Sequence, residues 1–228
     1  MEQAAYDFAR ANKKAIAKRL TDPNVYPRES EPVSVFMAGS PGAGKTEASI
    51  ELLSALGASA IRIDADELRA ECPGYNGLNA WLYQRAAVIL VNKLQDVALE
   101  QSQSFVLDGT FSNIDLARQN VERSIKRKRL IQILYVYQEP ALAWKFVQDR
   151  EATEGRRVNP EHFVRQYFSA RTVVNAIKAE FGVAVKVDVL VKNVDNSNRN
   201  FHFGVEQIDP YIPERYSKAD VERIVNPD

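Results

Sequence analysis

Eight consecutive residues have the composition of a phosphate-binding loop. They are Gly39, Ser40, Pro41, Gly42, Ala43, Gly44, Lys45 and Thr46. They fit the pattern G-x-x-x-x-G-K-[ST], in which the lysine reaches the β- and γ-phosphates and the hydroxyl ligates Mg²⁺. Glycines let the backbone N–H groups surround a phosphate, and the helix that follows directs its positive end at the same anion. The segment therefore predicts a site for ATP or GTP with Mg²⁺.

Carboxylates follow two apolar runs that have the composition of strands. Asp64 and Asp66 end the run SAIRIDAD, and Asp108 ends SFVLD shortly before Thr110. Ligands of a parallel sheet bind beyond the carboxyl ends of its strands, so we expect these side chains on the side of the phosphate-binding loop. A kinase that acts on a hydroxyl needs such groups to deprotonate the acceptor and to hold Mg²⁺.

Each of these residues has a functional and a structural interpretation. Asp66 is the candidate base, and Asp64 either binds the metal through water or caps the helix that begins near Glu67. The same cap is the alternative for Asp66. Asp108 either serves Mg²⁺ or substrate or belongs to a turn. Thr110 either donates a hydrogen bond to substrate or caps the next helix.

Arginines are concentrated where a lid over the phosphates is expected. The segment 149–160 begins at a helix end, contains a glycine and ends at a proline. Arg150 and Arg157 are the candidates that stabilise the charge of the transferred phosphoryl group. The alternative for any surface arginine is solvation or a weak ion pair. For Arg171 the preferred interpretation is such a pair, with Glu180 or another charge on the helix face.

These residues need a scaffold of alternating strands and helices. The apolar, β-branched runs predict five strands, at 33–38, 59–64, 104–108, 130–137 and 184–191. Helical spacing predicts helices at 2–20, 46–56, 79–101, about 114–125, 140–151, 161–181 and 218–225. The alternation implies βαβ units. We therefore expect an α/β fold, a P-loop NTPase-like three-layer sandwich with a mainly parallel five-stranded sheet.

The turn-rich segment TDPNVYPRESEP separates the first helix from the first strand. We expect residues 1–28 to form an N-terminal helix and linker, and residues 29–228 to form the P-loop kinase domain with its lid near 150–160. The helix either docks near the nucleotide site as part of an inhibitor interface or simply packs on the domain. No motif is assigned to the region NSNRNFHFGVEQIDPYIPERYS.

The composition narrows the classes of partner. The chain has 228 residues, and 30 basic and 30 acidic residues cancel, which disfavours nucleic acid as a partner. No run approaches the length of a membrane helix. A single cysteine, Cys72, and the absence of a signal-peptide pattern favour the cytoplasm.

Other features favour structural roles. The basic run 126–129 is interpreted as a solvated helix end. Trp81 and Trp144 are interpreted as packing residues. His162 and His202 have no partner at metal-ligand spacing, so no zinc site is expected.

Taken together, the motifs resemble those of the zeta toxin family of toxin–antitoxin systems. The matching pieces, in family order between about residues 33 and 192, are AGSPGAGKT, IDADELR, PGY, VLDGTFSN, QDRE and GRRVNPEH. The resemblance implies a kinase that uses a nucleoside triphosphate to phosphorylate the 3′-hydroxyl of the amino sugar in UDP-N-acetylglucosamine. Such a toxin blocks cell-wall synthesis, and a protein antitoxin can block its nucleotide site.

The resemblance also implies roles for individual residues. Lys45 and Thr46 correspond to the residues that hold phosphates and Mg²⁺, and Asp66 corresponds to the catalytic base. Two further pairs follow from it: Asp108 and Thr110 for substrate contact, and Arg150 and Arg157 near the γ-phosphate. The family often has glutamate where this chain has Asp108, whose carboxylate is one methylene shorter.

Two rival interpretations belong to other classes. A polynucleotide 5′-kinase or an antibiotic phosphotransferase can share the loop, the aspartate and the arginine lid. A nucleotide-dependent switch or binding module would need the loop alone. The candidate base Asp66 beside the loop argues against the switch, and the zero net charge argues against a nucleic-acid substrate.

Overall fold

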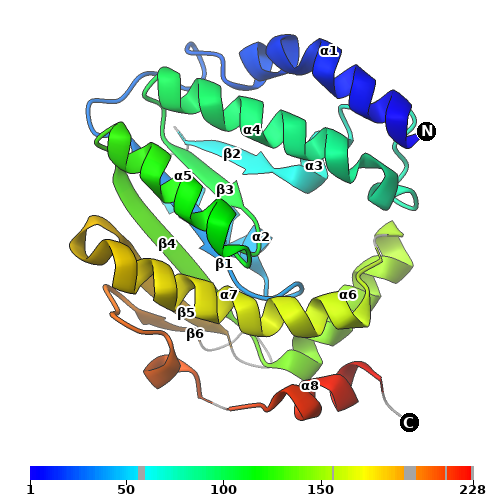
Figure 1. The fold of residues 1–228 in the computed structure, drawn as a ribbon, viewed down its shortest axis with the longest axis vertical. Coiled ribbons are helices and arrows are strands. Elements are labelled where there is room, and N and C mark those ends of the chain that lie inside the picture. Colours follow the sequence, from blue (N-terminus) through cyan, green and yellow to red (C-terminus); the bar gives the residue numbers. More distant parts are fainter. Residues whose placement is uncertain (56–59, 156, 193–198, 214, 227–228) are drawn as a thin grey trace.

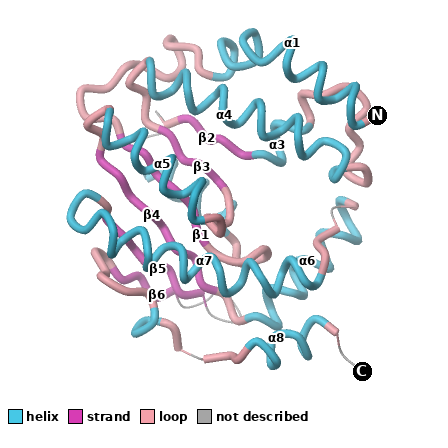
Figure 2. Tube along the Cα trace, in the orientation of Figure 1, coloured by secondary structure: helices cyan, strands magenta, loops and turns pink. Residues whose placement is uncertain are grey.

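The chain folds into a six-stranded, mostly parallel sheet with helices on both faces (Figures 1 and 2). The computed structural model describes residues 1–55, 60–155, 157–192, 199–213 and 215–226. The strands are β1 Val33–Ala38, β2 Ile61–Asp64, β3 Phe105–Asp108, β4 Leu130–Tyr137, β5 Lys186–Lys192 and β6 Arg199–His202. Their order is β2-β3-β1-β4-β5-β6, and only the β5–β6 pairing is antiparallel.

Helices alternate with the strands along the chain, as βαβ units require. The α-helices are α1 Glu2–Leu20, α2 Lys45–Ala55, α3 Ala65–Arg69, α4 Gln84–Glu100, α5 Ile114–Lys126, α6 Pro140–Glu154, α7 Pro160–Phe181 and α8 Lys218–Val225. Short 3₁₀ helices are η1 Ala80–Tyr83, η2 Gly182–Ala184 and η3 Asp209–Tyr211. No helix in the described part of the chain has the length and apolar character needed to cross a membrane.

Side-chain caps fix where the helices that flank the site begin. The Asn113 side chain accepts from the backbone N–H of Leu116 at 3.0 Å, which starts α5. The Asn159 side chain caps α7 in the same way, and Pro160 occupies the first turn, where no N–H is needed. Each such cap stabilises its helix by about 1 kcal/mol.

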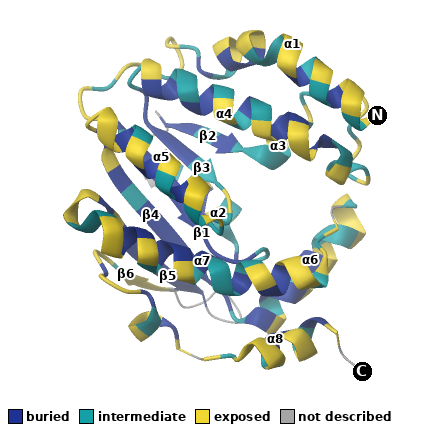
Figure 3. Cartoon of the chain, viewed as in Figure 1, coloured by how far each residue is buried: buried dark blue, intermediate teal, exposed yellow. Residues whose placement is uncertain are grey.

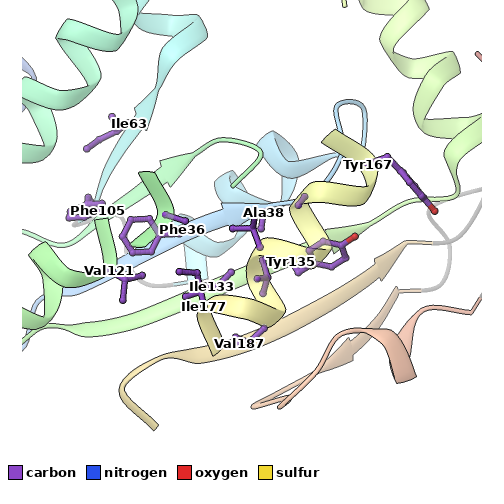
Figure 4. Close-up of a cluster of buried hydrophobic side chains, with 14 of the residues drawn as sticks. Phe36, Ala38, Ile63, Phe105, Val121, Ile133, Tyr135, Tyr167, Ile177 and Val187 are labelled. Carbon is purple, nitrogen blue, oxygen red and sulfur yellow. The ribbon is translucent and has the colours of Figure 1, made fainter. Parts of the chain in front are cut away.

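The two faces of the sheet bury unequal cores. Along β1, Phe36 and Ala38 belong to the large core, whereas Val35 and Met37 belong to a smaller one on the opposite face. This alternation follows from the two-residue period of a strand. Figure 4 shows side chains of the large core, including Ile133, packed over the sheet. Helices α4, α5 and α7 cover that face, and α2 covers the other (Figure 1).

The N-terminal helix α1 packs along α4 at the outside of the large core (Figures 1 and 3). Ala5, Ala9, Ile16 and Ala17 are its buried side chains. Small residues on this face let the two helix backbones approach closely. The division between residues 1–28 and 29–228 remains a prediction.

The sheet has one strand more than the five expected. β6 lies in the segment to which no motif was assigned, and it pairs with β5 at the sheet edge. An edge strand beside solvent needs no apolar run, so RNFH carries little strand signal. The predicted helix 79–101 is also divided, because η1 precedes α4.

The interpretation of the basic run 126–129 as solvated is wrong for Arg129, which is only 6% exposed. Its guanidinium donates to Ser34 Oγ at 2.7 Å, to the Val33 carbonyl at 2.9 Å and to the Gln103 carbonyl at 2.6 Å. It also lies over the ring of Phe105. Arg129 thus joins the N-terminal ends of the central strands.

We expect Arg129→Met to lower the free energy of unfolding by about 3 kcal/mol. The variant keeps the apolar stem but leaves buried acceptors such as the Gln103 carbonyl without their donor. Urea unfolding followed by circular dichroism measures the change. The control is Lys126→Ala at an exposed position, expected within about 0.5 kcal/mol of the parent. Equal stability of the two variants would contradict a structural role for Arg129.

Candidate active site

A cleft of about 1000 Å³ lies at the carboxyl ends of the parallel strands. Its lining includes these candidate residues: Pro41, Gly42, Ala43, Gly44, Lys45, Thr46, Asp64, Asp66, Asp108, Thr110, Arg150 and Arg157. The first two loop residues lie outside this lining. Ser40 is buried, and the backbone N–H of Gly39 donates to the Thr110 carbonyl at 3.2 Å, which joins the loop to the end of β3. One cleft therefore brings together the loop, the carboxylates and both arginines.

The phosphate-binding loop joins β1 to α2, and α2 begins at Lys45. The Lys45 ammonium donates to the Ser40 carbonyl at 2.7 Å, so it lies folded back over the loop. Desolvation by burial lowers the pKa of Lys45 to about 8, against the opposing effect of the nearby Asp108 carboxylate. The positive charge of Arg150 also contributes to lowering this pKa. The lysine thus occupies an environment in which a phosphate anion would strongly favour its charged form.

A second lysine contacts the phosphate-binding loop, and it was not among the residues predicted from the sequence. Lys192 ends β5, lines the cleft, is buried, and donates from Nζ to the Gly44 carbonyl at 3.2 Å. Residue 44 has φ of +78°, a left-handed conformation that favours glycine, and a Cβ there would also lie 2.0 Å from this Nζ. Its place at a strand end beside the loop was the available signal.

Arg62 is the other residue that the sequence analysis missed, and it connects the carboxylates. One guanidinium nitrogen, Nη2, lies 2.6 Å from Asp64 Oδ2 and 2.7 Å from Asp108 Oδ2. The side chain also donates to Ser49 Oγ of α2 and pairs with Glu67. Burial would lower the pKa of Arg62, but the hydrogen bond with Asp108 and the charge of Asp64 raise it. Arg62 precedes Asp64 by two residues in β2 and therefore shares its face, which was the available signal.

The prediction that Asp64 caps the following helix is confirmed for one of its two carboxylate oxygens. Asp64 Oδ1 accepts from the backbone N–H of Asp66 at 2.8 Å and caps α3. Asp66 itself lies in the first turn of α3 and pairs with Arg69, which also bonds to the Gln84 side chain. The helix-cap alternative for Asp66 is therefore wrong.

The cap alternative for Thr110 is also wrong, because Asn113 caps α5. The Thr110 hydroxyl bonds instead to Ser112 Oγ at 2.8 Å. Two residues earlier, the Asp108 side chain is only 6% exposed and pairs with Arg62. The hydroxyl and the carboxylate therefore lie at the end of β3 within the cleft.

The arginines of the predicted lid differ in their environments. Arg150 lies within α6, because this helix runs to Glu154 and does not end near residue 151 as expected. Arg150 Nε lies 3.5 Å from Glu154 Oε2, so the two side chains form an ion pair. The Arg157 side chain is 80% exposed and lies 3.8 Å from Glu151. Both face the cleft.

Arg171 lies outside the residues that line the cleft. It pairs with Asp209 at 3.6 Å, whereas Glu180 pairs with Arg118 at 2.8 Å. The preferred interpretation as an ion-pair residue therefore holds, with a different partner from Glu180.

The side chains that line the cleft are suited to binding Mg²⁺ together with the phosphates of a nucleotide. Among the described residues no group of three or more His, Cys, Asp or Glu side chains is arranged to hold a metal ion. Mg²⁺ in phosphate-transfer sites needs no such cage, because phosphates and waters supply most of its ligands. Thr46, Asp64 and Asp108 line the same cleft and offer one hydroxyl and two carboxylates.

Comparisons with known proteins agree with this fold and motif set. A family model described as zeta toxin matches residues 16–206. A structure of the PezAT chromosomal toxin–antitoxin system of Streptococcus pneumoniae aligns over 98% of this chain and 87% of that chain, with a TM-score of 0.61 and 14% identity. A structure of AvrRxo1-ORF1:-ORF2 with ATP aligns over 92% of this chain and 70% of that chain, with a TM-score of 0.67 and 12% identity. A search of curated proteins finds no match.

We expect the affinity for ATP to fall as the pH rises from about 8 to about 9. In the free protein the pKa of Lys45 is lowered to about 8, and a bound phosphate raises it, so binding above this pH requires proton uptake. The dissociation constant should rise by up to about tenfold over this pH unit. Calorimetry in buffers of different ionisation enthalpy measures both the affinity and the proton count. The control, Lys45→Met, should bind weakly without this pH dependence, and a flat profile for the parent protein would contradict the assignment.

We expect Arg62→Met to lower the free energy of unfolding by about 3 kcal/mol, because two neighbouring carboxylates, with side chains only 12% and 6% exposed, lose their shared counter-charge. Adding Asp108→Asn should restore part of the loss, which a double-mutant cycle with denaturant unfolding measures. The control is Glu67→Gln, which removes only the exposed partner of Arg62. Strictly additive effects of the Arg62 and Asp108 changes would contradict the coupling.

Proposed function

Because the chain belongs to the zeta toxin family, we propose that it is a kinase that phosphorylates a UDP-sugar. The γ-phosphate of ATP or GTP is transferred to the 3′-hydroxyl of the amino sugar of UDP-N-acetylglucosamine or a related UDP-sugar. The observation that carries the proposal is that Lys45 of the phosphate-binding loop and Asp66 line one cleft. A donor bound on the loop and an acceptor beside the carboxylate would then meet within that cleft.

The residues of the cleft divide the work of phosphoryl transfer. Asp66 accepts the proton of the attacking hydroxyl, and Asp108 and Thr110 hold the acceptor. Lys45 holds the β- and γ-phosphates, and the guanidinium of Arg150 faces the charge that develops on the transferred group.

Arg157 is a further cation in the lining of the cleft. Its exposed side chain and its place after α6 support the proposed lid near residues 150–160, of which residue 156 lies outside the described residues. Thr46 and Asp64 would hold Mg²⁺, directly or through water. When bound, this ion neutralises charge on the phosphate oxygens.

A protein antitoxin is part of the proposal. The solved structures similar to this chain include a toxin–antitoxin system and a two-component complex with ATP. We propose that this chain is likewise a toxin component, acting in the cytoplasm on cell-wall precursors, and that a cognate antitoxin covers its nucleotide site.

The acceptor is tested by incubating the protein with Mg²⁺–ATP and a panel of UDP-sugars, short oligonucleotides and aminoglycosides. Mass spectrometry then detects the gain of a phosphate. A phosphorylated UDP-N-acetylglucosamine supports the proposal. A phosphorylated oligonucleotide or aminoglycoside in its place would replace it with one of the rival kinase functions. ATP binding without any product would favour the nucleotide-dependent switch.

We expect Asp66→Asn to lower kcat by about 10²- to 10⁴-fold, because the amide cannot accept the hydroxyl proton. The dissociation constant for ATP should stay within about twofold, because Asp66 does not touch the phosphates in this mechanism. Product formation by mass spectrometry and ATP binding by calorimetry measure the two effects. The control is Asp115→Asn, at an exposed position of α5 outside the cleft lining, which should retain parental activity. Full activity of Asp66→Asn would refute the assignment of the base.

A further inference from the structure

One large aromatic side chain in the wall of the cleft is unpacked. Trp81 is 72% exposed, although the sequence analysis interpreted it as a packing residue. Trp144, the other tryptophan, is only 7% exposed and packs against Phe163. Trp81 lines the same cleft as the phosphate-binding loop. The face of this indole is therefore open to a ligand bound in the cleft.

The backbone around Trp81 is firmly anchored, so its exposure is not the result of a loose segment. Tyr83 of the same 3₁₀ helix is buried and donates to the Pro73 carbonyl at 3.0 Å. Two residues before Trp81, Asn79 donates from Nδ2 to the Gly74 carbonyl at 2.8 Å. Its Oδ1 accepts from the backbone N–H of Asn76 at 3.1 Å.

The loop before η1 also rests against the end of α6. A Cβ at Gly77 would lie 2.4 Å from the Glu154 carbonyl, and a Cβ at Gly155 would lie 2.2 Å from Leu78 Cδ2. The loop and the helix end are therefore in contact. The ring of Trp81 is thus presented from a segment held on both sides, which keeps the entropic cost of ligand binding low.

A chain of contacts links this ring to the candidate base. Asp66 pairs with Arg69, and Arg69 bonds to the Gln84 side chain. Gln84 follows Trp81 by three residues, so the two side chains emerge on one face of the helical turn. All four residues line the cleft. A ligand whose hydroxyl lies at Asp66 would extend along Arg69 toward the indole.

We infer that Trp81 forms a stacking subsite for a planar ring carried by the acceptor and thereby contributes to the affinity for that acceptor. This inference rests on the proposed kinase function and specifies the acceptor end of its cleft. Every nucleobase has a π-face that an indole can stack on, so the subsite selects for a ring without selecting one base. Uracil of a UDP-sugar and a ring of a dinucleotide are the two sources of this chemistry.

Fluorescence tests the subsite without any chemistry. With the donor site saturated by a non-hydrolysable ATP analogue, UDP-N-acetylglucosamine or nicotinamide adenine dinucleotide is titrated. Whichever is the source of the ring should quench tryptophan emission. N-acetylglucosamine 1-phosphate, which lacks the ring, should not. In Trp81→Phe the quenching should vanish, because only the buried Trp144 remains. Absence of quenching by both ring-bearing ligands overturns the inference.

Kinetics with the acceptor that is phosphorylated provide the second measurement. Trp81→Ala should raise its KM by about 5- to 150-fold with little change in kcat, and Trp81→Phe should recover most of the loss. Because the side chain is exposed, neither variant should change the thermal midpoint. An unchanged KM in Trp81→Ala overturns the inference, even if phosphoryl transfer itself is confirmed. Quenching by a ring-bearing ligand without transfer to any acceptor would instead support the subsite and refute the kinase proposal.

Discussion

The parallel pairing of β2 with β3 imposes the central constraint on this molecule. Its register places Asp64 directly beside Asp108 at the edge where the sheet meets the cleft. Two carboxylates side by side repel each other, and burial makes the repulsion stronger because water screens it less. Arg62 removes the conflict with a single nitrogen shared by both. The strand register that builds the site therefore also requires a cation shared by the two carboxylates.

Charged side chains also interact with one another around the phosphate-binding loop. The ammonium groups of Lys45 and Lys192 both donate to carbonyls of the phosphate-binding loop. Arg150 of α6 lies close enough to affect the pKa of Lys45. Burial of Lys45 and the positive charge of Arg150 both disfavour the charged form of Lys45 before a nucleotide arrives. The negative charge of a triphosphate would favour the charged form of Lys45. The cleft is therefore organised around its ligand, and the lowered pKa of Lys45 reflects this arrangement.

Local sequence signals were sufficient for the scaffold. The phosphate-binding loop is contiguous, its strand and helix follow two clear periodicities, and the helices α1 and α8 have the predicted bounds. The carboxylates at strand ends were predictable because parallel strands share one carboxyl edge. The features that could not be predicted from the sequence depend on contacts between segments that are distant along the chain. Arg129 is buried by strands far from it in the chain, and Trp81 is exposed because the cleft opens beside it. Strand β6 forms by pairing with β5 at the sheet edge and not by its own pattern.

The unequal covering of the sheet has a consequence for local dynamics. Helix α2, which carries Lys45 and Thr46, rests on the smaller core, whereas the opposite face is held by three helices and α1. Backbone opening can therefore occur in this layer at a lower free energy than unfolding of the whole chain. In the proposed site a bound triphosphate would contact the start of α2 and would stabilise the closed layer by mass action. Nucleotide would then act on this protein as a local clamp, slowing hydrogen exchange in α2 far more than in α4 or α7.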